Sequence, residues 1–124
     1  MLEVMNELPL HVAGFRAKGQ VTKHDYEKVL IPAVDRVAKQ FGYLHFLMVL
    51  DTDVKNFTLG AWMDDAKVGL KHYTKWRKMA FVTDQEGVKT FSEIFGIVVP
   101  GKLKTFSHNQ LEEAIEWVSD NTNS

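Results

Sequence analysis

Apolar positions along the chain recur in two periods, and these periods predict short strands separated by helices. Five segments have the length and composition of strands: residues 2–5, 12–18, 44–50, 79–82 and 102–106. In the second segment apolar and more polar positions alternate, so we expect a strand with one wetter face. The third segment is apolar nearly throughout, which is typical of a central strand that helices bury on both faces.

Other stretches have the apolar spacing of amphipathic helices: residues 22–41, 58–70, 84–95 and 109–118. Thr22, with Asp25 three residues later, predicts a capping box at the start of the first helix. Gly42 predicts where that helix ends. Pro32 lacks the amide proton that a helix interior needs, so we expect a kink, or two helices meeting near Ile31.

The next helix is expected to begin at Thr58, whose hydroxyl can accept a hydrogen bond from the first helical turn. Its apolar residues predict the side that packs on the sheet: Leu59, Trp62, Met63, Ala66 and Leu70. By the same count, Asp64 and Asp65 should face water.

The order of elements, ββαβαβαβα, predicts an α/β fold in a single domain that spans residues 1–124. Alternation of strands with helices favours one mixed, mostly parallel sheet of about five strands, flanked by about four helices. The first strand is expected to pair antiparallel with the second.

The composition excludes several classes of protein. The 124 residues are 45% hydrophobic and include no cysteine, which argues against disorder and excludes disulfides, thiolate metal sites and a thiol nucleophile. The longest stretch without a charged residue, 40–50, is about half of the roughly 20 residues that a membrane span needs. The first residues lack the pattern of a secretory signal, so we expect a cytoplasmic protein.

Charge is distributed unevenly along the chain. The net charge is −1, but residues 67–78 carry +5 and no acid, so the rest of the chain carries −6. Basic and aromatic side chains together suit the headgroups of an anionic membrane, where each basic residue adds about 1 kcal/mol. The alternative is a solvated helix end that the helix dipole favours. The residues of this predicted membrane or anion surface are Lys67, Lys71, His72, Lys75, Trp76, Arg77 and Lys78. No sequence motif of a nucleic-acid-binding domain is present, so we expect no nucleic-acid partner.

Apolar residues beyond the predicted core gather around the helix after Thr58 and around a later connection. They are Phe57, Trp62, Met63, Phe91, Phe95, Ile97 and Val98. Connections normally run over the surface, so an apolar one predicts a groove for a hydrophobic ligand, a partner site or a membrane contact. The alternative is ordinary core that covers the edge of the sheet.

Asp51 and Asp53 follow the central strand, where open α/β sheets place ligands. The string resembles the aspartate motif of haloacid-dehalogenase-type phosphatases, which hold Mg²⁺ through oxygen ligands. No acidic pair after a later strand completes such a site, so hydrogen bonding within the loop is the favoured interpretation. The histidines lack metal-ligand spacing, and His45 is expected to be a structural, hydrogen-bonded residue. We therefore expect no metal, no cofactor and no enzymatic activity.

Several short strings, taken in order and spacing, carry a resemblance that covers essentially the whole chain. They stand at residues 25–33, 44–51, 58–61, 69–72, 95–96, 100–101 and 111–117. The chain resembles the small bacterial SpoIIAA-like family, relatives of the STAS domains. The resemblance implies a mixed sheet with helices, related to anti-sigma-factor antagonists and to the CRAL-TRIO lipid-transfer fold. It also implies hydrophobic-ligand binding or membrane association as the family's suspected activity.

The chain departs from the anti-sigma-factor antagonists at the helix after the third strand. In those proteins a phosphorylatable serine opens this helix, whereas Thr58 is the only nearby hydroxyl here and no acid directly precedes it. Thr58 is therefore a candidate phosphosite by position, not by motif.

Three functions follow from these patterns. The first is non-enzymatic binding of a hydrophobic or lipid-like ligand, or peripheral association with the inner face of an anionic membrane. The second is a STAS-like module that regulates a protein partner, with a homodimer also open. The third is Mg²⁺-dependent phosphoryl transfer at Asp51 and Asp53.

Overall fold

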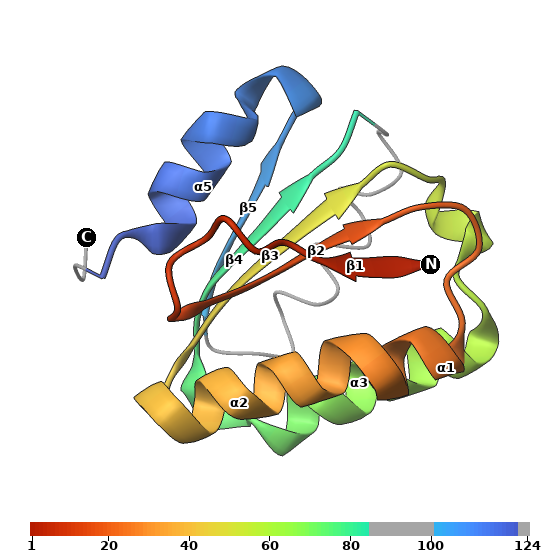
Figure 1. The fold of residues 1–124 in the computed structure, drawn as a ribbon, viewed down its shortest axis with the longest axis horizontal. Helices are drawn as coiled ribbons and strands as arrows, with labels where there is room; N and C mark the ends of the chain where they lie inside the picture. Colours follow the sequence, from red (N-terminus) through yellow and green to blue (C-terminus); the bar gives the residue numbers. More distant parts are fainter. Residues whose placement is uncertain (85–100, 122–124) are drawn as a thin grey trace.

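The structure is a computed structural model that describes residues 1–84 and 101–121, and these residues form a mixed sheet between two layers of helices (Figure 1). The strands lie in the order β1 (Leu2–Val4), β2 (Val12–Ala17), β3 (Leu44–Leu50), β4 (Trp76–Val82) and β5 (Lys102–Phe106). β1 is antiparallel to β2, whereas the other neighbouring pairs are parallel. The predicted α/β class and mostly parallel sheet are confirmed, while most of the helix predicted at residues 84–95 lies outside the described residues.

Helices cover both faces of the sheet (Figure 1). One layer holds α1 (Lys23–Asp25), the π-helical turn η1 (Tyr26–Leu30), α2 (Ile31–Phe41) and α3 (Leu59–Lys71), and the other holds α5 (Leu111–Ser119). Short 3₁₀ turns are η2 (Val54–Asn56), η3 (Tyr73–Lys75) and η4 (His108–Gln110). Because β2, β3 and β4 add in one direction, right-handed crossovers place α2 and α3 on the same face. Within the described part of the chain, no helix is both long and apolar enough to cross a membrane.

The first helical stretch is interrupted where Pro32 predicts it. Thr22 and Asp25 form the expected capping box, in which the Thr22 amide donates to Asp25 Oδ2 at 2.8 Å. The amide of Ile31 then donates to the carbonyl of Tyr26, five residues back, so a π-helical turn precedes α2. Pro32 sits in the first turn of α2, where no amide proton is needed. The stretch is two helices that meet at Ile31.

The central strands are more deeply buried than the alternating pattern of β2 predicts. All seven residues of β3 are buried, as expected for the central strand. On the expected wetter face of β2, Arg16 is half-buried and Lys18 beyond the strand is exposed, whereas Val12 and Gly14 are buried. A Cβ at Gly14 would lie 2.1 Å from Leu8 Cδ1, so the loop before β2 closes over this face.

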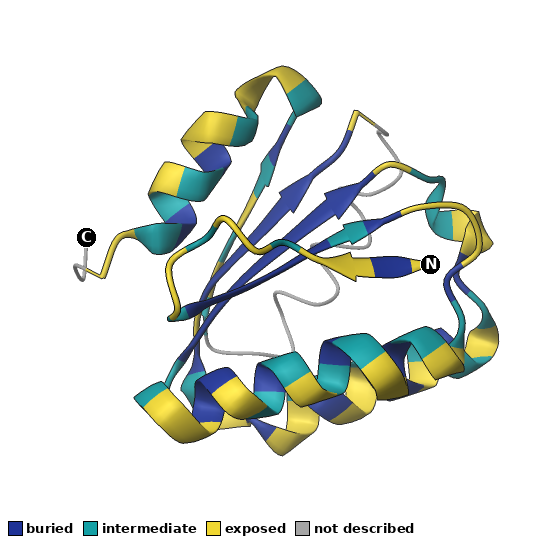
Figure 2. Cartoon of the chain, viewed as in Figure 1, coloured by how far each residue is buried: buried dark blue, intermediate teal, exposed yellow. Residues whose placement is uncertain are grey.

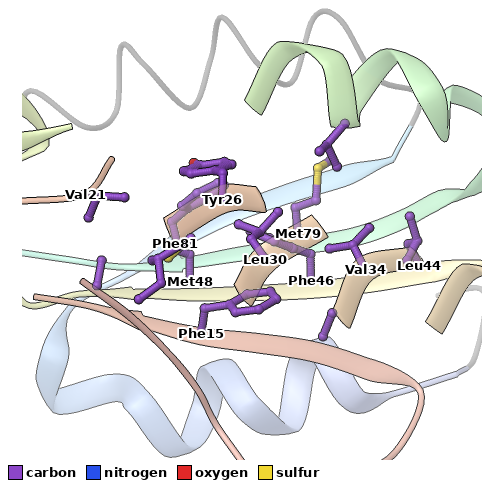
Figure 3. Packing of buried hydrophobic residues seen from close by; sticks show 14 of the residues in the cluster. Phe15, Val21, Tyr26, Leu30, Val34, Leu44, Phe46, Met48, Met79 and Phe81 are labelled. Carbon is purple, nitrogen blue, oxygen red and sulfur yellow. The ribbon is translucent and has the colours of Figure 1, made fainter. Parts of the chain in front are cut away.

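The core is divided by the sheet into two parts (Figure 2). The larger part lies under α2 and α3 and includes Phe15, Tyr26, Leu30 and Phe46 (Figure 3). The smaller part lies under α5. α2, α3 and α5 therefore each bury one side toward the sheet, and their opposite sides are available for function.

Candidate functional site

The start of α3 is fixed by the loop that follows β3. Val21 and Phe57 form an isolated parallel bridge, in which the Thr58 amide donates to the Val21 carbonyl at 2.9 Å. Thr58 Oγ1 accepts a hydrogen bond from the Ala61 amide at 3.2 Å, so Thr58 caps the helix as predicted. A Cβ at Gly60 would lie 2.9 Å from Lys23 Cβ, and this close approach to α1 sets the rotation of α3.

The predicted inward face of α3 is wrong. Ala61, Asp64 and Val68 are buried, whereas Leu59, Met63 and Leu70 are 75%, 54% and 64% exposed. Helix positions advance by about 100°, so these two sets lie on opposite sides of α3. The large apolar residues of α3 lie on its outer side, whereas the inner side packs through Ala61 and Val68, with Asp64 also buried.

The outward placement predicted for Asp64 and Asp65 is wrong for the same reason. Asp64 is 4% exposed, and its Oδ2 has no hydrogen-bond partner among the described residues. Asp65 accepts a hydrogen bond from the Tyr26 hydroxyl at 2.7 Å. Burial raises the pKa of Asp65 to about 6, against the opposing effect of that hydrogen bond. This contact ties α3 to η1.

The outer side of α3 carries an apolar stripe that no described element covers. Its members share the spacing of four and three residues and are all exposed: Leu59, Met63, Ala66, Leu70 and Tyr73, the last in η3. We call this set the outer stripe. Large apolar side chains gathered on one exposed line mark an interaction surface more often than single exposed ones do.

The predicted basic surface is dispersed by the fold. Lys71 lies 3.1 Å from Asp35 of α2, and His72, which is buried, lies 2.8 Å from the same carboxylate. The Arg77 guanidinium stacks over the Tyr43 ring at 4.1 Å. Among the described residues, Lys67 and Lys75 are the cations of this segment with neither an ion pair nor a cation–π contact. The segment is not one continuous membrane-facing surface.

A β-bulge separates Trp76 and Lys78, two other residues of the predicted basic surface. Leu44 pairs with Trp76 and His45 pairs with Lys78, so Arg77 is an extra residue in β4. Trp76 therefore points into the core under α3, where its Nε1 donates to the Gly69 carbonyl at 3.1 Å. Lys78 points to the face covered by α5 and is 4% exposed. Their shared inclusion in one surface was wrong because both side chains are buried, on opposite faces of the sheet.

The predicted ligand-binding residues are only partly within the described chain. Phe57 is buried and its ring stacks on that of Trp62 at 5.2 Å, whereas Met63 belongs to the outer stripe. Phe91, Phe95, Ile97 and Val98 lie outside the described residues. A cavity of about 40 Å³ under α3 is lined by other side chains, including Phe46, Trp76, Met79 and Phe81. Phe57, Trp62 and Met63 are not among the described residues that line it.

Four charged residues meet at the carboxyl edge of the sheet, each from a different strand or strand end. Asp51 accepts hydrogen bonds from Arg16 Nη1 at 2.6 Å and from His108 Nε2 at 2.9 Å. His108 Nδ1 lies 2.9 Å from Asp84 Oδ2. We call Arg16, Asp51, Asp84 and His108 the edge cluster. Of these four, only Asp51 was predicted from the sequence as a candidate site residue, since the other three come from distant segments that only parallel pairing brings together.

Both ring nitrogens of His108 face carboxylates, so both hydrogen bonds form only when the ring is a doubly protonated imidazolium. Although partial burial opposes it, hydrogen bonding to Asp51 and Asp84 raises the pKa of His108 above 6.5. The bonds from Arg16 and His108 likewise outweigh burial and lower the pKa of Asp51.

The predicted magnesium site at Asp51 and Asp53 has little support in this geometry. Asp51 is engaged by two cationic groups, and Asp53 Oδ1 accepts from the Lys55 amide at 3.0 Å, which caps η2. Among the described residues, no three histidine or carboxylate side chains are placed so that they could hold one metal ion. The Asp53 bond matches the expected hydrogen bonding within the loop, whereas Asp51 instead bonds to side chains from distant segments.

At the amino edge of the sheet, three side chains bind the last carbonyls of α5. His11 Nε2 donates to Ser119 O at 2.8 Å, His45 Nδ1 to Val118 O at 2.5 Å, and Lys78 Nζ to Trp117 O at 3.0 Å. These carbonyls have no partner within a helix, and a cation is favoured at this end. His45 is therefore structural, as predicted, and the set docks α5 onto β2, β3 and β4.

Comparisons with known proteins address the fold. A family model described as SpoIIAA-like matches residues 12–119. A solved structure from Shewanella loihica PV-4, an uncharacterized protein with a SpoIIAA-like fold, has a TM-score of 0.71 and 24% identity, and the match covers 94% of this chain and 93% of that one. No curated protein matches the chain. The solved structure supports the fold and carries no activity with it.

Proposed function

The chain belongs to the SpoIIAA-like family, and on that premise we propose that it is a non-enzymatic regulatory module that binds a partner protein through the outer stripe of α3. One observation carries the proposal: the side of α3 opposite its buried residues exposes Leu59, Met63 and Leu70. Burying one such side chain contributes about 1.5–3 kcal/mol. The inner side already anchors α3 to the sheet, so a partner can cover the outer side without unfolding the module.

A site-specific cross-linking experiment tests this proposal. A photoreactive amino acid replaces Met63 in one variant and Glu113, an exposed residue of α5, in another. In the native cell, we expect a discrete cross-linked species from position 63 and none from position 113. Adding Leu70→Asp should abolish the species, whereas Leu10→Asp, which changes a residue 67% exposed in the loop before β2, should leave it intact. A species that survives Leu70→Asp would contradict the proposal.

Lipid or membrane binding is the competing proposal, because the exposed residues of the outer stripe could also enter a headgroup layer. The dispersed cations weaken it. Among the described residues, only Lys67 and Lys75 of the basic segment have neither an ion pair nor a cation–π contact. Sedimentation with anionic vesicles separates the two proposals. Sedimentation that Met63→Asp abolishes, together with no cross-linked protein, would favour the membrane.

Phosphorylation of Thr58 would act on the same helix. Its Oγ1 caps the α3 amino terminus, where the helix dipole favours a negative group. We propose Thr58 as a regulatory site of the module. The cross-linking yield at position 63 should then differ between phosphorylated protein and a Thr58→Ala variant, and equal yields would remove Thr58 from the proposal.

A further inference from the structure

The outer stripe has the geometry of a helix-packing seam. Its spacing of four and three residues is that of the contact positions in a pair of helices. From Leu59 to Leu70 the seam extends about 16 Å along α3, at about 1.5 Å per residue. A partner helix with the same spacing could place its apolar residues between those of the seam, as packed helices do.

The flank of the seam is positively charged on the side toward α2. Lys67 follows Ala66 of the stripe, is exposed, and has no ion pair among the described residues. Lys71, one turn later, reaches Asp35 of α2 and so shows which side of α3 this flank lies on. The acids of α3, Asp64 and Asp65, are turned inward. A partner therefore meets an apolar seam with a cationic edge and no carboxylate from α3.

A second copy of the chain is a poor match for this seam. In a two-fold antiparallel pair of outer stripes, the axis passes near Ala66, which is the middle member of the set. Lys67 of each copy would then face Lys67 of the other, and like charges in contact oppose association. Opposite charge at this position would instead favour it.

We infer that the outer stripe docks an amphipathic helix of a partner protein whose flank, next to Lys67, carries carboxylates. This inference rests on the proposed function and specifies the partner's chemistry. Apolar contacts along the seam supply the affinity, and the pairing with Lys67 selects the orientation and the partner. Reversal of the charge at Lys67 should therefore change which helix binds and leave the fold intact.

Two synthetic peptides test the inference on the intact chain. Both have 18 residues, roughly five helical turns, with leucines at the seam spacing, and they differ only in flanking residues, which are glutamates in one and lysines in the other. Amide resonances of the labelled protein report where each peptide binds. We expect the glutamate peptide to shift resonances of residues 59–73 and to bind about tenfold more tightly than the lysine peptide.

A variant with reversed charge at position 67 tests whether Lys67 selects the peptide. Lys67→Glu should weaken the glutamate peptide roughly fivefold and strengthen the lysine peptide. The matched control Lys102→Glu, at an exposed position in β5, should change neither. Equal binding of both peptides, shifts outside residues 59–73, or no binding of either would overturn the inference. So would a dimer, or binding to anionic vesicles, that Met63→Asp abolishes.

The two proposals fail in different ways. Cross-linking at position 63 that depends on Leu70, combined with peptides that bind equally, would leave the docking surface in place and reject the acidic flank. Selective peptide binding without any cross-linked species in the cell would support the chemistry of the seam and reject its use as a protein-docking surface.

Discussion

The two edges of the sheet each hold a histidine that joins separate parts of the chain, but in opposite charge states. At the carboxyl edge, His108 lies between Asp51 and Asp84 and needs both protons for its two bonds. At the amino edge, His45 donates from Nδ1 to the carbonyl of Val118, and its Nε2 is buried without a described partner. The hydrogen bonds of His108 need a charged ring, whereas the bond of His45 forms with a neutral ring.

The surroundings explain the difference. His45 is 1% exposed, and burial lowers its pKa below 6.5, with further lowering by His11, Lys78 and Arg77. His108 is partly exposed and faces carboxylates, with Arg16 behind Asp51. The amino edge therefore depends on desolvated hydrogen bonds, whereas the carboxyl edge depends on ion pairs that water screens. We expect the amino edge to contribute more to stability.

The sharpest test of that ranking is truncation of each histidine. His45→Ala removes a buried ring and leaves the Val118 carbonyl unsatisfied, so the free energy of unfolding should fall by about 3 kcal/mol. His108→Ala should cost less than about 1 kcal/mol. Chemical denaturation measures both, with the exposed His24→Ala as the control. Equal costs for His45 and His108 would remove the contrast between the edges.

The pH dependence of stability should have opposite signs at the two edges. The folded pKa of His45 is lowered, so its contribution is present above pH 6.5 and is lost as the pH falls through the folded value. The folded pKa of His108 is raised, so its contribution is complete below pH 6.5 and is lost as the pH rises through the folded value.

Imidazole resonances in an NMR titration check these two directions. Difference curves of unfolding free energy against pH, for wild type minus His45→Gln and wild type minus His108→Gln, isolate each residue. The subtraction matters because Asp65, with a pKa raised to about 6, stabilises the folded state as the pH falls in an overlapping range. A folded pKa of His45 above 6.5 would show that the ring is not neutral.

Local patterns predicted the parts of the fold that depend on neighbours in sequence. A few adjacent residues are enough to predict the buried strand β3, the capping box of Thr22 and Asp25, and the break at Pro32. The edge cluster could not be found in this way, because Arg16 and His108 meet Asp51 only through strand pairing. Parallel order does place strand ends together, and that signal pointed to Asp51.

Periodicity misplaced α3 because it counts apolar residues and does not weigh their size. Leu59 and Leu70 suggested the inner side, yet Gly60 and Ala61 permit the close approach to α1 and to the core. The surplus apolar residues were thereby left outside. The large apolar residues that the pattern assigned to the core therefore form the outer stripe, which no described element covers.

Neutralising Asp51, the carboxylate shared by Arg16 and His108, should show how much its charge contributes to the pKa of His108 and to stability. Asp51→Asn removes the partner of Arg16 and His108, so the pKa of His108 should fall toward 6.5 and stability should fall by less than about 1 kcal/mol. Asp53→Asn is the matched control, because Asp53 caps η2 and is not bonded to His108. An unchanged His108 titration in Asp51→Asn would show that Asp84 alone sets its protonation.

Salt provides the smallest and most selective test of the two edges. Ions screen charges that water reaches, and the Debye length falls from about 10 Å at 0.1 M salt to about 3 Å at 1 M. The pKa of His108 should therefore move down toward 6.5 as sodium chloride is added, since its carboxylates are solvent-exposed. The pKa of His45 should change less, because its lowering comes first from burial, which salt does not alter. NMR titrations at both salt concentrations measure the two shifts, and equal movement of both histidines would mean that nearby charge, not burial, sets the protonation of the amino edge.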